Sequence, residues 1–148
     1  MTQPASHPLD SFRFHIDLRP RFSDLDGFGH VNNANYFTYF EEGRVAYAYK
    51  LGVFLLQDSP ISFVIQEASC RFLLPLLHHH RFQVYLRAAD WEAKRFSFYY
   101  ALWLPKEEAL AATGHSIAVA YDFKKKQTAL IPDEYLQKMK RFEQADEK

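Results

Sequence analysis

The pattern of hydrophobic and polar residues changes its period along the chain, and each change marks a new element. Residues 12–22 alternate apolar and polar side chains almost strictly, and a period of two is typical of a strand with one buried face. Pro20 near the end of this segment favours an edge position or a strand terminus. Later segments with strand character are separated by short links, which predicts antiparallel hairpins or meanders. These segments are residues 62–74, 81–91, 95–104 and 110–123.

From residue 34 to residue 50 the apolar positions follow a helical rhythm instead. Asn32 or Asn33 is suited to cap the start of this helix, and Gly52 is suited to end it. The pattern therefore predicts one long helix, the main helix of the chain. Its apolar positions are Tyr36, Phe37, Phe40, Tyr47, Ala48 and Leu51.

The order of the elements predicts an α+β protein. Pro132 opens a short polar helix over residues 133–144, so the order is strand, long helix, four strands, short helix. One long helix cannot cover both faces of a five-stranded sheet. We therefore expect a curved antiparallel sheet wrapped around the helix, with dimerisation protecting an edge or a face. Residues 1–11 are expected to form a flexible arm, and residues 12–148 a single domain.

Composition and charge exclude several classes of protein. Lys and Arg number 18 and Asp and Glu also number 18, so no global basic field exists to attract nucleic acid. The single cysteine, Cys70, cannot form an internal disulfide, which fits a reducing compartment. Residues 1–10 lack the pattern of a signal peptide, and no apolar run is long enough to insert into a membrane. The sequence predicts a soluble, cytoplasmic protein.

The segment 24–44 carries the most chemical information. It opens with two carboxylates, Asp24 and Asp26, on a Gly-containing turn, and it then enters the long helix. Free backbone N–H groups at a helix start can stabilise a developing oxyanion, and a nearby carboxylate can act as a base or a nucleophile. This combination predicts acyl chemistry.

The same segment resembles a known family, the hotdog-fold acyl-CoA thioesterases of the 4-hydroxybenzoyl-CoA thioesterase type. The resemblance rests mainly on residues 24–36 and 40–44, and it covers residues 12–140 in all. Weaker similarities follow in the expected order at residues 67–75, 94–98, 112–115 and 131–133. The resemblance implies a hotdog fold and hydrolysis of an acyl-CoA, or of an acyl carrier protein thioester. It also implies a homodimer or homotetramer with the substrate tunnel at a subunit interface, and no metal or cofactor.

The resemblance also implies roles for particular residues. Asp26 matches the family's catalytic carboxylate and would act as general base or as nucleophile; both routes stay open. Asn33 matches the start of the family's helix, where its backbone N–H would bind the oxyanion. Secondary candidates are His30, Glu41 and Tyr36.

Each of these residues also has a structural interpretation. Asp26 can hydrogen-bond to the backbone of its own turn, and on spacing alone this structural role is favoured. The family motif around Asp26 reverses that preference and favours the catalytic role. For His30 we favour a role in fixing the turn over a role as general base. Glu41 is three residues from Arg44 and can pair with it on the helix surface. Asp24 is expected to cap the turn or orient its neighbours.

The histidine run 78–80 departs from the family, many of whose members have a Gly-Asp turn here. In an extended segment alternate histidines face opposite sides, and no cysteine or carboxylate cluster adjoins them in the sequence to complete a zinc shell. We therefore expect a solvated loop. Arg81 and Lys124–Lys126 can meet the phosphates of coenzyme A, although such charge runs are more typical of solvated surface. Cys70 is expected to be a buried apolar residue.

Two alternative functions compete with hydrolysis. A hydratase or dehydratase of the same fold needs an Asp–His pair at a spacing that this chain lacks, because His30 follows Asp24 by six residues and Asp26 by four. A non-catalytic module that binds acyl thioesters would keep the pocket without Asp26-dependent hydrolysis.

Overall fold

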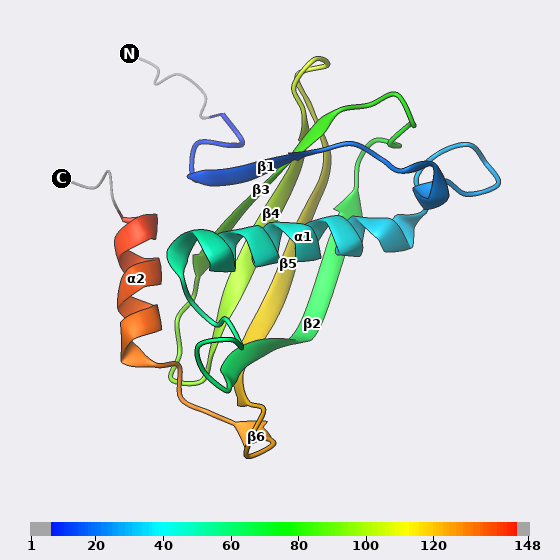
Figure 1. Cartoon of the computed structure of the whole chain (residues 1–148). Coiled ribbons are helices and arrows are strands. Elements are labelled where there is room, and N and C mark those ends of the chain that lie inside the picture. The colour runs from blue at the N-terminus through cyan, green and yellow to red at the C-terminus, as the bar shows by residue number, and fades with distance from the viewer. Residues whose placement is uncertain (1–6, 145–148) are drawn as a thin grey trace, which may run out of the picture.

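The computed structural model describes residues 7–144, and its centre is one antiparallel sheet that curves around a long helix (Figure 1). The helix α1 (Asn33–Leu51) crosses the concave face of the sheet, and α2 (Asp133–Glu143) lies near the C-terminal end of α1. The strands are β1 (Phe14–Leu18), β2 (Ile61–Phe72), β3 (Phe82–Ala89), β4 (Arg95–Leu104), β5 (Ala109–Asp122) and β6 (Gln127–Thr128). The predicted α+β hotdog architecture is confirmed.

The sheet has the order β1-β3-β4-β5-β2, with the two-residue β6 paired to the end of β5. β3, β4 and β5 form the predicted meander, and β1 lies at an edge, as Pro20 predicted. The expectation that β2 pairs with its neighbour in sequence is wrong, because β2 pairs with β5 at the opposite edge. Residues 73–81 carry the chain across the sheet between β2 and β3, a link too long for a tight hairpin.

Local sequence signals fix both ends of α1. The side-chain oxygen of Asn32 accepts a hydrogen bond from the Ala34 N–H at 2.9 Å, so Asn32 is the N-cap. Gly52 adopts the left-handed conformation at φ 67°, which glycine allows without strain, and ends the helix. The helix therefore extends only one residue beyond the predicted 34–50 range at each end.

One face of α1 packs on the sheet through aromatic side chains. Phe40 stacks on Tyr100 of β4, with ring centroids 4.3 Å apart, directly above Gly114 of β5. A Cβ atom at Gly114 would lie 2.5 Å from the Phe40 ring, so only glycine permits this close approach. Tyr39 is buried, whereas Phe37 of the predicted apolar stripe is 37% exposed and lies on the flank of the packed face.

The described part of the chain contains no helix that is long and apolar enough to cross a membrane. Residues 1–6 of the predicted arm, and residues 145–148, lie outside the described residues. Within the described part of that arm, the His7 ring contacts Trp103 of β4 edge to face, with centroids 5.0 Å apart. β2 is twelve residues long, and only one of its edges pairs with another described strand.

Candidate active site

Asp24 anchors the loop that leads into α1. It ends a 3₁₀ turn (Phe22–Asp24) and is 1% exposed. Its carboxylate accepts hydrogen bonds from the Tyr39 hydroxyl at 2.7 Å, from the Arg21 backbone at 2.9 Å and from the Arg21 guanidinium at 3.0 and 3.2 Å. Burial alone would raise the pKa of Asp24, but the hydrogen bonds from Tyr39 and Arg21 outweigh it and hold that pKa below its usual range.

The backbone of Asp24 also holds the helix start. Its carbonyl oxygen accepts the Asn32 N–H at 2.9 Å and the side-chain amide of Asn35 at 3.0 Å. Every donor in this network belongs to the loop or to the first two turns of α1. The predicted structural role of Asp24, which orients its neighbours, is therefore confirmed.

Asp26 has one carboxylate oxygen bound to its own turn and one directed to a histidine. Oδ1 accepts a hydrogen bond from the Phe28 N–H at 2.9 Å. This is the bond within the turn that the structural alternative for Asp26 predicts. Oδ2 lies 3.6 Å from Nδ1 of His30, and the Asp26 side chain is 22% exposed. The Asp26 N–H donates to the His30 carbonyl at 2.9 Å, and this bond closes the turn. One oxygen is thus fixed while the other can still take a proton.

The start of α1 presents a backbone donor beside this loop. Asn33 is the first helical residue, and the first N–H groups of a helix have no intrahelical acceptor. The Asn32 side chain takes the Ala34 N–H, whereas none of the hydrogen bonds among residues 7–144 uses the Asn33 N–H. This group can therefore donate to a ligand oxygen.

A hollow of about 230 Å³ opens at the helix start, and we call it the carbonyl hollow. The Tyr36 hydroxyl donates to the Leu74 carbonyl at 3.4 Å, and burial raises the pKa of Tyr36. Phe72 packs edge to face against Tyr36, with centroids 4.9 Å apart. Five of the eight lining residues are apolar, which suits the acyl or thioether part of a ligand. The lining residues are His30, Val31, Asn33, Tyr36, Phe72, Leu73, Leu74 and Pro75.

Four of the five predicted site residues come together here: His30, Asn33 and Tyr36 line the carbonyl hollow, and Asp26 adjoins it through His30. Glu41 does not join them. It is 67% exposed, lies 4.0 Å from the Arg44 guanidinium as the sequence predicted, and lines a different hollow. Cys70 is half-buried, and burial raises the pKa of its thiol to about 11, which disfavours a role as nucleophile.

The sequence did not indicate which segment the loop before α1 pairs with. The Val31 N–H donates to the Leu76 carbonyl at 2.8 Å, and an isolated β-bridge joins His30 to Leu77. The link 73–81 therefore lies against the 26–31 turn. The apolar pair Leu76-Leu77 within a presumed loop was the signal available in the sequence, and Leu76 is fully buried.

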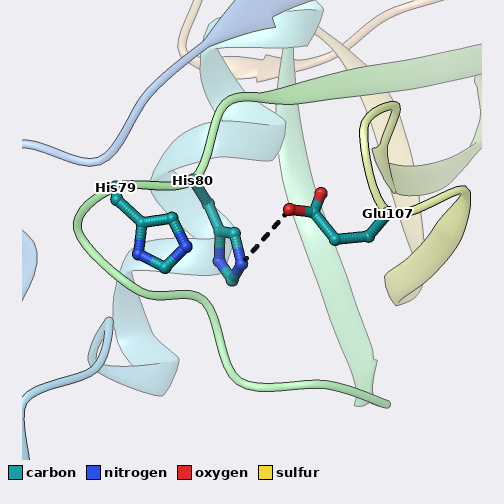
Figure 2. Close-up of side chains that lie close together, drawn as sticks. All are labelled: His79, His80 and Glu107. Carbon is teal, nitrogen blue, oxygen red and sulfur yellow. Dashed lines mark ion pairs between the residues drawn. The ribbon is translucent and has the colours of Figure 1, made fainter.

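The histidine run meets a carboxylate that the sequence did not indicate. Figure 2 shows Glu107, from the turn between β4 and β5, facing His80, with Nε2 and Oε1 3.9 Å apart. His79 lies close by, and ligand atoms of the three residues fall within 4.8 Å of one another. No carboxylate cluster adjoins the histidines in the sequence, but three-dimensional folding brings one carboxylate, Glu107, to them from 27 residues away along the chain.

The hydrogen bonding of His80 nevertheless favours a loop clamp over a metal site. Nδ1 accepts the Leu77 N–H at 2.9 Å, so in the neutral ring the proton sits on Nε2 and faces Glu107. A metal-bound histidine instead donates its second ring N–H to an acceptor. Burial, then His79, lowers the pKa of His80 despite Glu107, which favours that neutral ring.

Comparisons with known proteins agree with this fold. The model of the thioesterase-like superfamily matches residues 20–139. The chain belongs to this superfamily. A putative esterase of Aquifex aeolicus is 31% identical over 127 residues, which are 82% of this chain and 94% of that protein. The uncharacterized protein YsmA of Bacillus subtilis is 29% identical over 90 residues, 61% of this chain, and the match spans only about 60% of that relative's length.

Solved structures extend the similarity to the whole hotdog fold. A gentisyl-coenzyme A thioesterase has a TM-score of 0.76 and 25% identity, with 85% of this chain and 99% of that chain covered. A hypothetical protein of Staphylococcus aureus, solved in complex with CoA, has a TM-score of 0.81 at 18% identity, with 88% and 84% covered, and shares the fold. The thioesterase superfamily and the hotdog fold are therefore established for this chain.

Proposed function

We propose that this protein is an acyl-CoA thioesterase that hydrolyses an acyl-CoA to the free acid and coenzyme A. One observation carries the proposal: Asp26 keeps one carboxylate oxygen outside its own turn, beside a helix whose first backbone N–H is unused. The apolar wall of the carbonyl hollow and membership of the thioesterase-like superfamily support it. The relative named as a gentisyl-coenzyme A thioesterase supports coenzyme A as the thiol.

In the general-base route, Asp26 takes a proton from a water molecule as the water oxygen attacks the thioester carbon. The carbonyl oxygen becomes an oxyanion, which the Asn33 N–H stabilises together with the positive end of the α1 dipole. When the tetrahedral intermediate collapses, the carbon–sulfur bond breaks and the thiolate leaves. Protonated Asp26 then returns the proton to the sulfur, so the carboxylate is restored.

In the nucleophilic route, Oδ2 of Asp26 attacks the thioester carbon directly and the thiolate leaves with the carbon–sulfur electron pair. The product is a mixed anhydride, which water hydrolyses to the free acid and the Asp26 carboxylate, and the proton released in this step passes to the thiolate. Both routes use the same oxygen and the same N–H group. His30 lies 3.6 Å from Asp26, close enough to orient this carboxylate, and we assign it a supporting role.

We propose further that the enzyme is a homodimer joined through β2, with a homotetramer as a higher assembly. The free edge of a twelve-residue strand is a strong template for pairing with a second copy. Apolar side chains are exposed on β2, just after it, and on the adjoining start of α1. They are Phe37, Val64, Phe72, Leu73 and Leu74. Because three of them also line the carbonyl hollow, a partner on this edge would complete its wall.

Thiol release from a panel of acyl-CoAs tests the proposal. The panel spans short to long aliphatic chains and an aromatic acyl group, because the walls of the hollow suit either. We expect the parent protein to hydrolyse at least one of these substrates, and we expect Asp26→Asn to lose this activity. Binding of acyl-CoA without Asp26-dependent release would instead favour the non-catalytic module.

A further inference from the structure

A second hollow, of about 510 Å³, is lined by the later part of the link 73–81, and we call it the arginine hollow. It forms where β1 ends and β3 begins, because Leu18 and Phe82 are paired in the sheet and the residues just outside them face each other. No carboxylate lines it. The lining residues are Arg19, Pro20, Arg21, Phe22, His78, His79, His80 and Arg81.

Two of its three guanidinium groups are available to a ligand. Arg21 is bound to Asp24 at 3.0 Å. Arg19 and Arg81 are exposed and make no hydrogen bond or ion pair with any residue from 7 to 144. In a chain with zero formal net charge, this is a local concentration of positive charge without an internal partner.

None of the described acids around the arginine hollow forms an ion pair with Arg19 or Arg81. Asp24 is bound to Arg21, and Glu107 faces His80. Arg19 and Arg81 also border an adjoining hollow whose acids are Asp17, Asp24 and Glu42. Asp17 accepts the Gln83 side chain at 3.1 Å, and Glu42 lies near enough to Arg21 to raise the pKa of that guanidinium, after Asp24.

An exposed aromatic ring completes the arginine hollow. Phe22 is 79% exposed, which is a high value for a phenylalanine, and the His78 ring packs against it edge to face with centroids 6.0 Å apart. The clamp between His80 and Glu107 in Figure 2 holds the segment that carries His78 and Arg81. An exposed aromatic face beside cationic groups suits a nucleobase attached to phosphates.

One segment connects the arginine hollow to the candidate active site. Residues 73–75 line the carbonyl hollow and residues 78–81 line the arginine hollow. Between them, Leu76 and Leu77 are joined to Val31 and His30 of the active-site turn. A ligand lying across this segment would meet an apolar wall at one end and arginines at the other.

We propose that the arginine hollow binds the phosphorylated nucleotide end of coenzyme A, with phosphates on Arg19 and Arg81 and the adenine on Phe22. This inference rests on the proposed acyl-CoA hydrolysis and assigns the substrate as a CoA thioester. Guanidinium groups bind phosphate oxygens through paired hydrogen bonds, which two arginines on facing strand ends can supply. The same arginines disfavour a divalent cation at His79 and His80.

Kinetics with three thioesters of one acyl group test the assignment: acyl-CoA, acyl-dephospho-CoA and acyl-pantetheine. The double variant Arg19→Gln/Arg81→Gln should raise KM for acyl-CoA about tenfold, the factor that corresponds to about 1.4 kcal/mol. The double variant should leave kcat unchanged, and it should leave KM for acyl-pantetheine unchanged. The increase in KM for acyl-dephospho-CoA should lie between the increases for the other two substrates. Arg141→Gln, an exposed arginine on α2, is the matched control. Equal effects on acyl-CoA and acyl-pantetheine, or no effect on either, would overturn the assignment.

Binding of 3′,5′-ADP to Asp26→Asn separates this inference from the hydrolysis on which it rests. Loss of calorimetric binding in the double variant, but not with Arg141→Gln, supports the site even if no acyl-CoA is hydrolysed. Inorganic phosphate binding as tightly as 3′,5′-ADP would reduce the hollow to a simple anion site and overturn the inference. Arginine-dependent hydrolysis confined to acyl carrier protein thioesters would overturn it as well, because the hollow would then serve an acidic protein surface.

Discussion

Asp24 and Asp26 are two residues apart, yet their surroundings give them different tasks. The Asp24 carboxylate is buried and accepts four hydrogen bonds, from Tyr39 and Arg21. The Asp26 carboxylate keeps one oxygen directed to His30 at the edge of the carbonyl hollow. A buried carboxylate whose oxygens are all occupied by hydrogen bonds stabilises the structure. A carboxylate with an oxygen that accepts no hydrogen bond can still accept a proton. The sequence motif assigned a structural role to Asp24 and a catalytic role to Asp26, but it did not indicate the partners of Asp24, because Tyr39 lies on the helix and Arg21 before the turn.

Asp24→Asn should lower the stability of the fold in a pH-dependent way. The pKa of Asp24 is lower in the folded protein than its ordinary value of 3.8. The charged carboxylate therefore stabilises the fold fully at pH values above that ordinary pKa. That contribution is lost as pH falls through the lower folded pKa. Urea unfolding should show a cost of about 1–3 kcal/mol at pH 7 that shrinks below about pH 4. Asp58→Asn, an exposed position, is the control; a pH-independent difference would contradict the assigned role of the charge.

The proposed oxyanion donor can be removed without disturbing α1. Asn33 is the first helical residue, a position where proline is favoured, and Asn32 already has the extended conformation that proline requires before it. Asn33→Pro should therefore lower kcat about 10²- to 10³-fold at nearly unchanged melting temperature. Asn33→Ala, which keeps the N–H, should be mild. Equal activity of the two variants would remove the Asn33 N–H from the mechanism.

Among the elements, those defined by local signals were predictable and those defined by distant contacts were not. The helix start at Asn32 and its end at Gly52 depend on neighbouring residues, so sequence predicted them within one position. The placement of β2 beside β5, and of Glu107 beside His80, depends on segments far apart in the chain. The same distinction applies to the candidate site: the motif indicated Asp26 and Asn33, but not the link 73–81 that completes the hollow.

The contact between α1 and the sheet depends on Gly114. Adding a Cβ atom would push the Phe40 ring away from Tyr100, and overpacking of a tight core usually costs about 1–3 kcal/mol. Gly114→Ala should therefore lower the free energy of unfolding by about that amount in urea denaturation. Gly27→Ala is the control, since no atom lies within 4 Å of a Cβ there. A neutral Gly114→Ala would mean that Phe40 has room to move.

For the whole molecule, the free edge of β2 predicts assembly. Light scattering should give a mass of two or four times 17.4 kDa. Val64→Lys, which places a charge on β2, should weaken the assembly, whereas Leu130→Lys, at a 64% exposed position beyond β6, should not. A monomeric parent, or equal behaviour of the two variants, would contradict an interface at β2.

The proposed role of Asp26 in thioester hydrolysis can be tested by comparing the parent protein with Asp26→Asn. Thiol release by the parent and by Asp26→Asn should be measured on the best acyl-CoA of the panel, with melting temperatures recorded alongside. The amide keeps the size and the turn bond to Phe28 but cannot take a proton or attack, so kcat should fall about 10²- to 10⁴-fold with stability unchanged. A stable Asp26→Asn protein that releases thiol at the parent's rate would contradict the account.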